Sequence, residues 1–233
     1  MRCAELREQV CAANRALEAH GLVTLTWGNV SGLDLAAGLV AIKPSGVAYA
    51  ALRPVDIVLV DLDGAVVEGE LRPSTDTPTH LALYRAWEGL GGVCHTHSEA
   101  ATAFAQARRE LPCLGTTHAD HFDGAVPLTR QLTAAEVAAG YEAATGRVLV
   151  ERFAGPPAVD PARVPAALVA GHGPFTWGAD AAAAVVHAVA LEAVARMALS
   201  SLALGPAVEL EDFLRTKHQN RKHGRDAYYG QRG

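Results

Sequence analysis

The spacing of apolar and polar positions changes from helical to strand-like soon after the chain begins. In the first twenty residues, apolar side chains recur at steps of three and four from Cys3 to Leu17, which predicts an amphipathic helix that ends at Gly21. The apolar stretches that follow are short and separated by turn residues, which is typical of strands. These expected strands are Leu22–Thr26, Leu39–Lys43, Asp56–Asp61 and Val66–Glu68.

Helical and strand-like segments alternate through the rest of the chain. Thr77 followed by Pro78 is typical of a helix start, with Thr77 as the expected N-cap and Pro78 at the first helical position, and Thr133 with Glu136 forms a capping box that opens another helix. The expected helices are Thr77–Trp87, Glu99–Arg109, Thr133–Ala144 and Ala181–Leu204, and the expected strands are Val93–His97, Arg147–Arg152, Ala167–Gly171 and Phe175–Trp177. Without a repeat or a linker, this pattern predicts a single α/β domain over residues 1–233 with a layered core.

The segment Ala181–Leu204 is apolar around nearly its whole circumference, which predicts burial on several sides and a subunit interface. Its longest apolar run is interrupted by His187 and followed by Glu192, and is shorter than the roughly 18 residues of a membrane span. The four cysteines show no disulfide spacing, and the N-terminus lacks the order of a signal peptide. We expect a cytoplasmic protein with no membrane partner.

Composition narrows the possible functions. A chain of 233 residues that is 50% hydrophobic folds as one unit or at most two small ones. Its 20 basic and 25 acidic residues give a net charge of -5, which leaves no basic surface for a nucleic acid. The ten histidines outnumber the lysines, and histidine is the side chain best suited to metals and to proton transfer near neutral pH.

Three histidines and one aspartate have positions that suit a metal. In His95-Thr96-His97, side chains two apart on a strand leave on the same face, so both imidazoles can reach one ion. His172 lies between two glycines, and Asp76 directly precedes an expected helix. Each of these residues also fits an ordinary structural role. Together, three imidazoles, a carboxylate and an open position are typical of a catalytic zinc site.

Three turns have the residues of a phosphate site. They offer backbone N–H groups, hydroxyls and one ammonium, although each turn taken alone also fits plain turn chemistry. The turns are Gly28-Asn29, Lys43-Pro44-Ser45-Gly46 and Ser74-Thr75. A third group of residues suits proton transfer. It comprises His118-Ala119-Asp120-His121, His218, His223 and Tyr228-Tyr229.

Seven segments together carry a family resemblance. They are Leu22–Ser31 (LVTLTWGNVS), Ile42–Val47 (IKPSGV), Pro73–His80 (PSTDTPTH), Cys94–Ser98 (CHTHS), Gly115–Asp120 (GTTHAD), His172–Gly178 (HGPFTWG) and Arg221–Gln231 (RKHGRDAYYGQ). Over essentially its whole length the chain resembles the L-ribulose-5-phosphate 4-epimerase family, within the class II aldolase and adducin-like superfamily. The resemblance implies a three-layer α/β/α sandwich with a central, largely antiparallel sheet.

The resemblance also implies roles for individual residues. The family's metal ligands, which hold zinc or another divalent ion such as Mn²⁺ or Co²⁺, fall on Asp76, His95, His97 and His172. Its phosphate-binding residues fall on Gly28, Asn29, Ser45, Gly46, Ser74 and Thr75, with Lys43 in the same turn. Its acid/base pair falls on Asp120 and Tyr229, with His218 as a weaker candidate near the substrate. The family's active sites lie between the subunits of a cyclic homotetramer, so the three groups are expected to form one site.

The activity that the resemblance implies is the interconversion of L-ribulose 5-phosphate and D-xylulose 5-phosphate. It proceeds by retro-aldol cleavage of the C3–C4 bond, a metal-stabilised enediolate and re-addition of the rotated aldehyde. The closest alternative is a sugar-phosphate aldolase of the L-fuculose-1-phosphate type. Such aldolases carry Glu at the position of Asp76 and lack the GTTHAD and AYYGQ segments. A non-catalytic adducin-like scaffold is less compatible, because such domains lose the metal histidines.

The chain departs from the family pattern after Asp120. Where the family usually reads HADYFYG, two tyrosines are replaced by His121 and Asp123. If the two carboxylates lie close together, Asp123 is expected to raise the pKa of Asp120.

Overall fold

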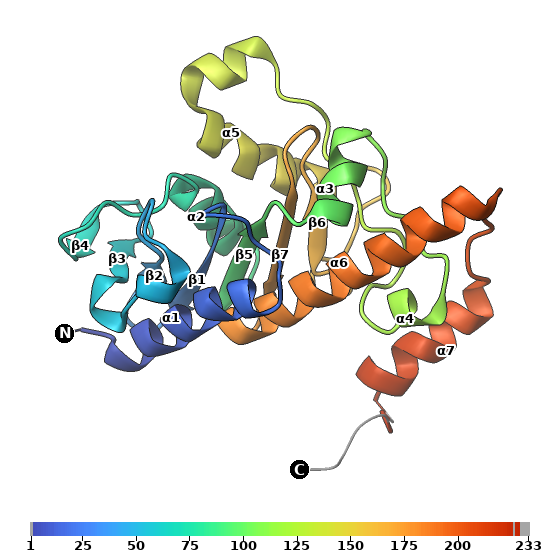
Figure 1. Ribbon diagram of the computed structural model, residues 1–233, viewed down its shortest axis with the longest axis horizontal. Helices are drawn as coiled ribbons and strands as arrows, with labels where there is room; N and C mark the ends of the chain where they lie inside the picture. Colours follow the sequence, from blue (N-terminus) through green and yellow to red (C-terminus); the bar gives the residue numbers. More distant parts are fainter. Residues whose placement is uncertain (1, 226, 229–233) are drawn as a thin grey trace.

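Within residues 2–225, 227 and 228, which the computed structural model describes, seven strands form one open sheet (Figure 1). They are β1 Gly28–Asp34, β2 Leu39–Ile42, β3 Val58–Asp61, β4 Val66–Glu68, β5 Gly92–Thr96, β6 Ala166–Leu168 and β7 Pro174–Gly178. The strand order is β4-β3-β2-β1-β5-β7-β6, and each neighbouring pair is antiparallel. The strand β5 therefore lies in the interior of the sheet, between β1 and β7.

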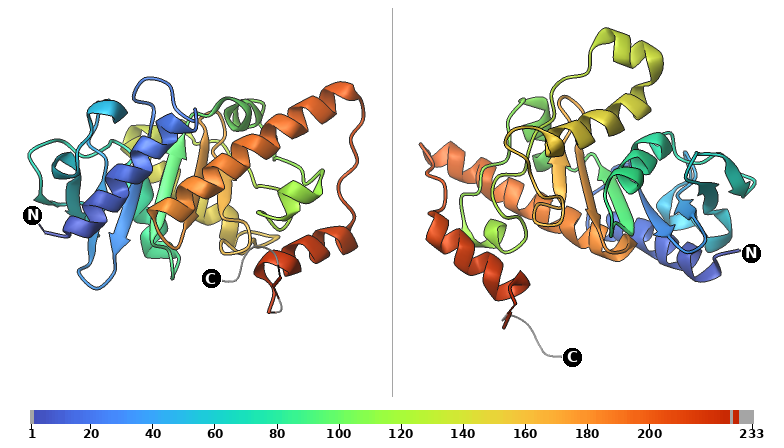
Figure 2. Two further views of the ribbon diagram at one scale, coloured as in Figure 1. Left: turned by 60° about the horizontal axis from the view of Figure 1, so that its bottom comes forward. Right: turned by 180° about the vertical axis from the view of Figure 1, so that it is seen from behind.

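Helices cover both faces of this sheet. They are α1 Ala4–Ala19, α2 Thr77–Ala86, α3 Glu99–Gln106, α4 Thr116–Ala119, α5 Ala134–Ala154, α6 Ala181–Leu204 and α7 Asp212–His223, with short 3-10 turns at Tyr49–Ala51 and Pro54–Asp56. In Figure 2, α1 and α6 lie side by side over one face, and α2 and α5 cover the other. The three-layer α/β/α arrangement with an antiparallel sheet confirms the prediction.

The two helical layers bury alternate residues of the strands, because successive side chains on a strand point to opposite faces. On β5, Val93 packs in the cluster that includes α2 and α5, whereas Cys94 packs in the cluster with α1 and α6. Every residue of β5 is buried. The strand that precedes His97 is therefore held rigidly between two hydrophobic cores.

The strand predicted over Leu22–Thr26 is wrong. The segment is a turn in which Leu25 has a left-handed φ of 54° and the Trp27 N–H donates to the Thr24 carbonyl at 3.1 Å. Leu22 is buried against α1 and α6 without pairing to a strand. Its apolar character serves helix packing, and the ladder begins only at β1.

The strand predicted over Arg147–Arg152 is also wrong, because this segment continues α5. Val148 and Leu149 are buried on the inner side of that helix. A Cβ at Gly146 would lie 2.5 Å from the Ala82 Cβ, so α5 packs closely against α2. This tertiary contact outweighs the local preference of a β-branched run for strand. In α2 the N-cap is Asp76, one residue earlier than predicted.

The helix α6 is long and apolar enough to cross a membrane by length and composition alone. It packs along one side on β5, β7, α1 and α3, which identifies it as a core helix of the sandwich. Other apolar side chains on α6 are exposed, among them Val186, Met197 and Leu199. They are compatible with the expected subunit interface, which stays a prediction.

Candidate metal centre and active site

Two histidines lie at the end of β5 and a third lies in the turn between β6 and β7. His95 is within β5, and His97 follows directly after Thr96, the last residue of the strand. Because β5 and β7 are neighbours, the turn that carries His172 lies against the end of β5. A Cβ at Gly173 would lie 2.8 Å from the Thr96 carbonyl oxygen. The close approach of the turn therefore requires glycine.

The three imidazoles point their Nε2 atoms at one another. Nε2 of His97 lies 3.0 Å from that of His95 and 3.1 Å from that of His172. Burial, reinforced by the neighbouring imidazoles, lowers the pKa of His172 to about 3 and also lowers the pKa of His97, so both rings are neutral at pH 7. On His95, Nδ1 lies 2.9 Å from the Pro174 carbonyl oxygen and donates to it, which leaves the Nε2 lone pair free.

Imidazole nitrogens at this distance either share a proton in an N–H···N hydrogen bond or hold a cation between their lone pairs. The three ligand atoms all lie within 4.8 Å of one another, and hydrogen-bonded outer nitrogens are typical of histidines that bind metal. The donor set therefore fits a divalent transition metal.

Asp76, at the N-cap of α2, lies close to this group. Its Oδ2 accepts a hydrogen bond from the Asn29 amide at 2.6 Å, and the same amide donates to Ser74 Oγ at 3.0 Å. Burial raises the pKa of Asp76, but the imidazoles of His95 and His80 and the Asn29 amide outweigh it, so its pKa is lowered overall. Within the described residues, Asn29 Oδ1 is buried and has no partner. That oxygen is available to accept a hydrogen bond from a ligand.

The histidines and Asp76 line one cavity of about 360 Å³. The residues predicted to bind phosphate line the same cavity. They are Gly28, Asn29, Lys43, Ser45, Gly46, Ser74 and Thr75. Four lining residues were not predicted from the sequence: Thr26, Trp27, Tyr141 and Glu142. The only local signal for the last two is Gly140, since a glycine inside a helical pattern marks a break.

Lys43 brings a buried positive charge to this cavity. Its side chain is 2% exposed, and Nζ donates to the Pro44 carbonyl at 3.3 Å and lies 4.9 Å from the centre of the Tyr49 ring. Burial lowers its pKa to about 8. Among residues 2–225, 227 and 228, no carboxylate forms an ion pair with it. Its charge is therefore available to an anionic ligand.

The chain that follows His97 is fixed by a buried carboxylate from α6. Glu192 is 2% exposed, and its oxygens accept from the N–H groups of Ala100 and Ala101 at 2.9 and 3.0 Å. These are unsatisfied donors of the first turn of α3, so Glu192 caps a helix distant in sequence.

Asp120 and His218 form a second polar group, where α4 meets α7. His218 Nδ1 and Arg221 Nε each lie 2.9 Å from Asp120 Oδ1, and Arg221 Nη2 contacts Oδ2. Among the described residues, neither Asp120 nor His218 lines the cavity of the histidines, so the described part of the third predicted group lies apart from the other two groups. Tyr229 lies outside the described residues.

The expectation that Asp123 raises the pKa of Asp120 is wrong. Asp123 pairs with Arg163 and, at 3.2 Å, with Arg215. Burial raises the pKa of Asp120, but the bonds that it accepts from Arg221 and the rest of α7 outweigh this effect and lower it. Each carboxylate has its own cation, so the two do not repel one another strongly.

Comparison with known proteins gives consistent matches. The family model described as Class II Aldolase and Adducin N-terminal domain matches residues 8–199. The L-ribulose-5-phosphate 4-epimerase UlaF of Salmonella paratyphi B is 53% identical over 229 residues, which cover 98% of this chain and 99% of that protein. The protein of the same name from Salmonella typhi matches with the same identity and coverage.

Solved structures of aldolases share the fold. An L-fuculose 1-phosphate aldolase matches with a TM-score of 0.79 at 25% identity and covers 95% of this chain and 97% of its own. The L-fuculose-1-phosphate aldolase from Thermus thermophilus matches with a TM-score of 0.64 at 26% identity, covering 88% of this chain and 100% of its own. Sequence identity to these aldolases is lower than to the epimerases.

Proposed function

Because the chain belongs to the class II aldolase and adducin family, we propose that it is an L-ribulose-5-phosphate 4-epimerase, which interconverts L-ribulose 5-phosphate and D-xylulose 5-phosphate. The observation that carries the proposal is the convergence of three imidazole Nε2 atoms in a cavity that is also lined by Lys43 and the Ser74-Thr75 turn. We propose that the enzyme works in the cytoplasm as a single class II aldolase-type domain, in the breakdown of sugars such as arabinose.

Asp76, His95, His97 and His172 would hold a divalent ion, which we propose is zinc, with Mn²⁺ or Co²⁺ as substitutes. The support is the neutral state of the His97 and His172 imidazoles and the inward Nε2 atoms of all three histidines. When bound, the ion supplies Lewis-acid stabilisation of negative charge on substrate oxygens.

The phosphate of the substrate would bind at two turns of the cavity and at the start of β1, because the Gly28-Asn29 pair expected to form a turn opens that strand instead. Lys43 offers an ammonium, and Ser45 and Gly46 follow it in an exposed turn where the Gly46 φ is 72°. Ser74 and Thr75 precede α2 and offer hydroxyls, whereas the Ser74 N–H already donates to the Lys43 carbonyl at 3.0 Å. Gly28 and Asn29 complete the proposed set, and the free Asn29 Oδ1 can accept from a substrate hydroxyl.

This anchoring is what a C4 epimerase needs. The C4 hydrogen is not adjacent to the carbonyl and is weakly acidic, so cleavage of the C3–C4 bond is the easier route to inversion. The phosphate-bearing fragment must stay bound while its aldehyde turns its other face, and the Lys43 turn holds that fragment. Two groups are then needed to move the proton of the C4 oxygen on opposite faces, and we assign them to Asp120 and Tyr229, with His218 beside Asp120.

Asp120 must reach the cavity from another copy of the chain, because it does not line the cavity of its own. We therefore propose a cyclic homotetramer whose active sites lie between neighbouring subunits. The exposed apolar side chains Val186 and Met197 lie about three turns apart on one face of α6 and support association through that face.

The test is to incubate the purified, zinc-loaded protein with L-ribulose 5-phosphate and follow D-xylulose 5-phosphate. We expect conversion, loss of bound metal and of activity in His97→Asn, and loss of activity with full metal content in Asp120→Asn. His20→Asn, which removes an exposed imidazole at the end of α1, is the matched control. Absence of conversion, with release of dihydroxyacetone phosphate from L-fuculose 1-phosphate, would instead identify an aldolase.

A further inference from the structure

The helix α5 is interrupted where it passes the cavity. Gly140 has φ 147° and ψ 98°, values outside the helical region. In Figure 1 the ribbon of α5 changes direction part-way along the helix. Glycine is the residue that adopts such a conformation at low cost. The residue at which the helix resumes, Tyr141, lines the cavity of the histidines.

The Tyr141 hydroxyl lies 3.0 Å from Nδ1 of His172. Nε2 of that ring points at His97, so a metal bound there takes the Nε2 lone pair and leaves the proton on Nδ1. Nδ1 then donates to the phenol oxygen. The tyrosine oxygen thus selects the tautomer of His172 and the orientation of its ring, as the outer partners of metal-binding histidines do.

The second half of α5 fixes the position of Tyr141. The Tyr141 carbonyl accepts a hydrogen bond from Thr145 Oγ1 at 2.9 Å, and the neighbouring Glu142 carbonyl accepts one from Thr79 Oγ1 on α2 at 2.7 Å. With the close contact at Gly146, these bonds hold this half of the helix against the layer that also carries Asp76.

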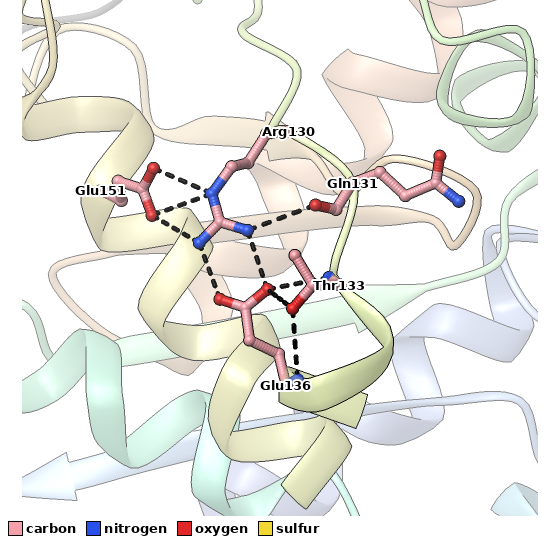
Figure 3. Close-up of polar contacts among 5 residues, drawn as sticks. All are labelled: Arg130, Gln131, Thr133, Glu136 and Glu151. Carbon is pink, nitrogen blue, oxygen red and sulfur yellow. Dashed lines mark hydrogen bonds and ion pairs between the residues drawn. The ribbon is translucent and has the colours of Figure 1, made fainter. Parts of the chain in front are cut away.

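Arg130 joins the two halves of α5 across the interruption (Figure 3). Its guanidinium contacts Glu136 at 2.7 and 2.9 Å, before Gly140, and Glu151 at 2.8 and 2.9 Å, after it. The same Glu136 carboxylate accepts from the Thr133 N–H at 2.8 Å in the capping box. One side chain therefore fixes the angle between the halves, since a paired guanidinium has a rigid planar geometry.

We propose that Tyr141 is a positioning residue for His172 in the metal centre, and that the Arg130–Glu136–Glu151 cluster holds the interrupted helix that presents it. This inference rests on the proposed metal centre. Tyr141 is therefore expected to increase metal affinity before any substrate binds. Arg130, which does not contact the histidines, is expected to increase it to a smaller extent.

The test measures binding of Co²⁺ alone by competition with a chelator, and the visible absorption of the bound ion, in the full-length protein. We expect Tyr141→Phe to weaken Co²⁺ binding by about 10- to 100-fold and to change the absorption spectrum, because His172 loses its outer partner. Tyr84→Phe is the matched control, since it removes a buried tyrosine hydroxyl that bonds Ser31 at 2.8 Å and no candidate ligand.

Arg130→Met should weaken Co²⁺ binding less than Tyr141→Phe does. Arg152→Met is its control, because Arg152 lies on the same helix and pairs with Glu110 at 2.8 Å, outside the cluster. Wild-type affinity and an unchanged spectrum in Tyr141→Phe overturn the role of Tyr141, and wild-type affinity in Arg130→Met overturns the role of the cluster. If the wild-type protein binds no Co²⁺, or binds it equally well as His97→Asn, the metal centre itself is wrong and the inference falls with it.

Discussion

Acid should destabilise this protein through His118. The side chain lies on α4, is 4% exposed, and donates from Nε2 to the Gly124 carbonyl at 2.7 Å. Burial, offset only in part by that carbonyl, lowers its pKa to about 4, whereas an unfolded histidine titrates at about 6.5. Between these two pKa values, His118 binds a proton more tightly in the unfolded chain than in the folded one. The stabilising effect of neutral His118 is complete above about pH 6.5 and is lost as the pH falls toward 4.

The size of the effect follows from the two pKa values. A pH of 5 lies about 1.5 units below the pKa of the unfolded imidazole, which is therefore mostly protonated, while the folded imidazole is still mostly neutral. At about 1.4 kcal/mol per pH unit, His118 lowers the free energy of unfolding by about 2 kcal/mol, and by about 3 kcal/mol at the acid limit. Since the whole free energy of unfolding is typically about 5–15 kcal/mol, this change is measurable.

The variant to compare is His118→Gln, whose amide keeps a donor for the Gly124 carbonyl but does not titrate. Urea unfolding at one protein concentration between about pH 7.5 and pH 4.5 measures the free energy of each protein. Between pH 7 and pH 5, the wild type should lose about 2 kcal/mol more than the variant. Val126→Ala removes buried apolar volume in the same region and should lower stability equally at every pH. Coincident pH slopes for the wild type and His118→Gln would show that His118 does not contribute to the acid sensitivity of the fold.

Two further predictions concern single charges. Burial lowers the pKa of the Lys43 ammonium to about 8, so in steady-state kinetics KM for the phosphosugar should rise as the pH increases through 8. Lys43→Met should raise KM about tenfold or more, and its KM should no longer change with pH in this range. Glu192→Gln should lower the free energy of unfolding in urea by about 1–2 kcal/mol. The two carboxylate oxygens accept from the N–H groups of Ala100 and Ala101, whereas the glutamine amide has only one oxygen, so one N–H group loses its acceptor. Glu99→Gln, an exposed control on α3, should change it by less than about 0.5 kcal/mol. A KM that does not change with pH would contradict the first prediction. Equal losses of unfolding free energy in Glu192→Gln and Glu99→Gln would contradict the second.

Features that depend on neighbouring residues could be predicted from the sequence. The capping box forms as expected, since the Glu136 N–H donates to Thr133 Oγ1 at 3.2 Å and the Thr133 N–H donates back to the Glu136 carboxylate. The convergence of His95 and His97 follows from the alternation of side chains along an extended chain, even though β5 ends between them. Both predictions need only local geometry.

Features that depend on distant packing could not be predicted in this way. Arg130 finds Glu151 across 21 residues, and Glu192 caps α3 from a helix more than 90 residues further along the chain. Tyr141 reaches His172 only because α5 breaks at Gly140, and the sequence there shows a glycine but not the direction in which the helix resumes. In each case a side chain of ordinary type acquires its role from an element that the local pattern does not specify.

The charge state of Asp120 constrains how the proposed reaction starts. Hydrogen bonds from α7 hold its pKa below the usual value, so the carboxylate is ionised at neutral pH and can accept a proton but has none to donate. The group that donates a proton to a C4 alkoxide on the opposite face must therefore be a different residue with a high pKa, such as a tyrosine phenol. The ionised state of Asp120 therefore requires two unlike groups, in agreement with the proposed pairing of Asp120 with Tyr229. His218, 2.9 Å from Asp120, is then placed to relay the accepted proton, which gives it a reason to lie beside the base.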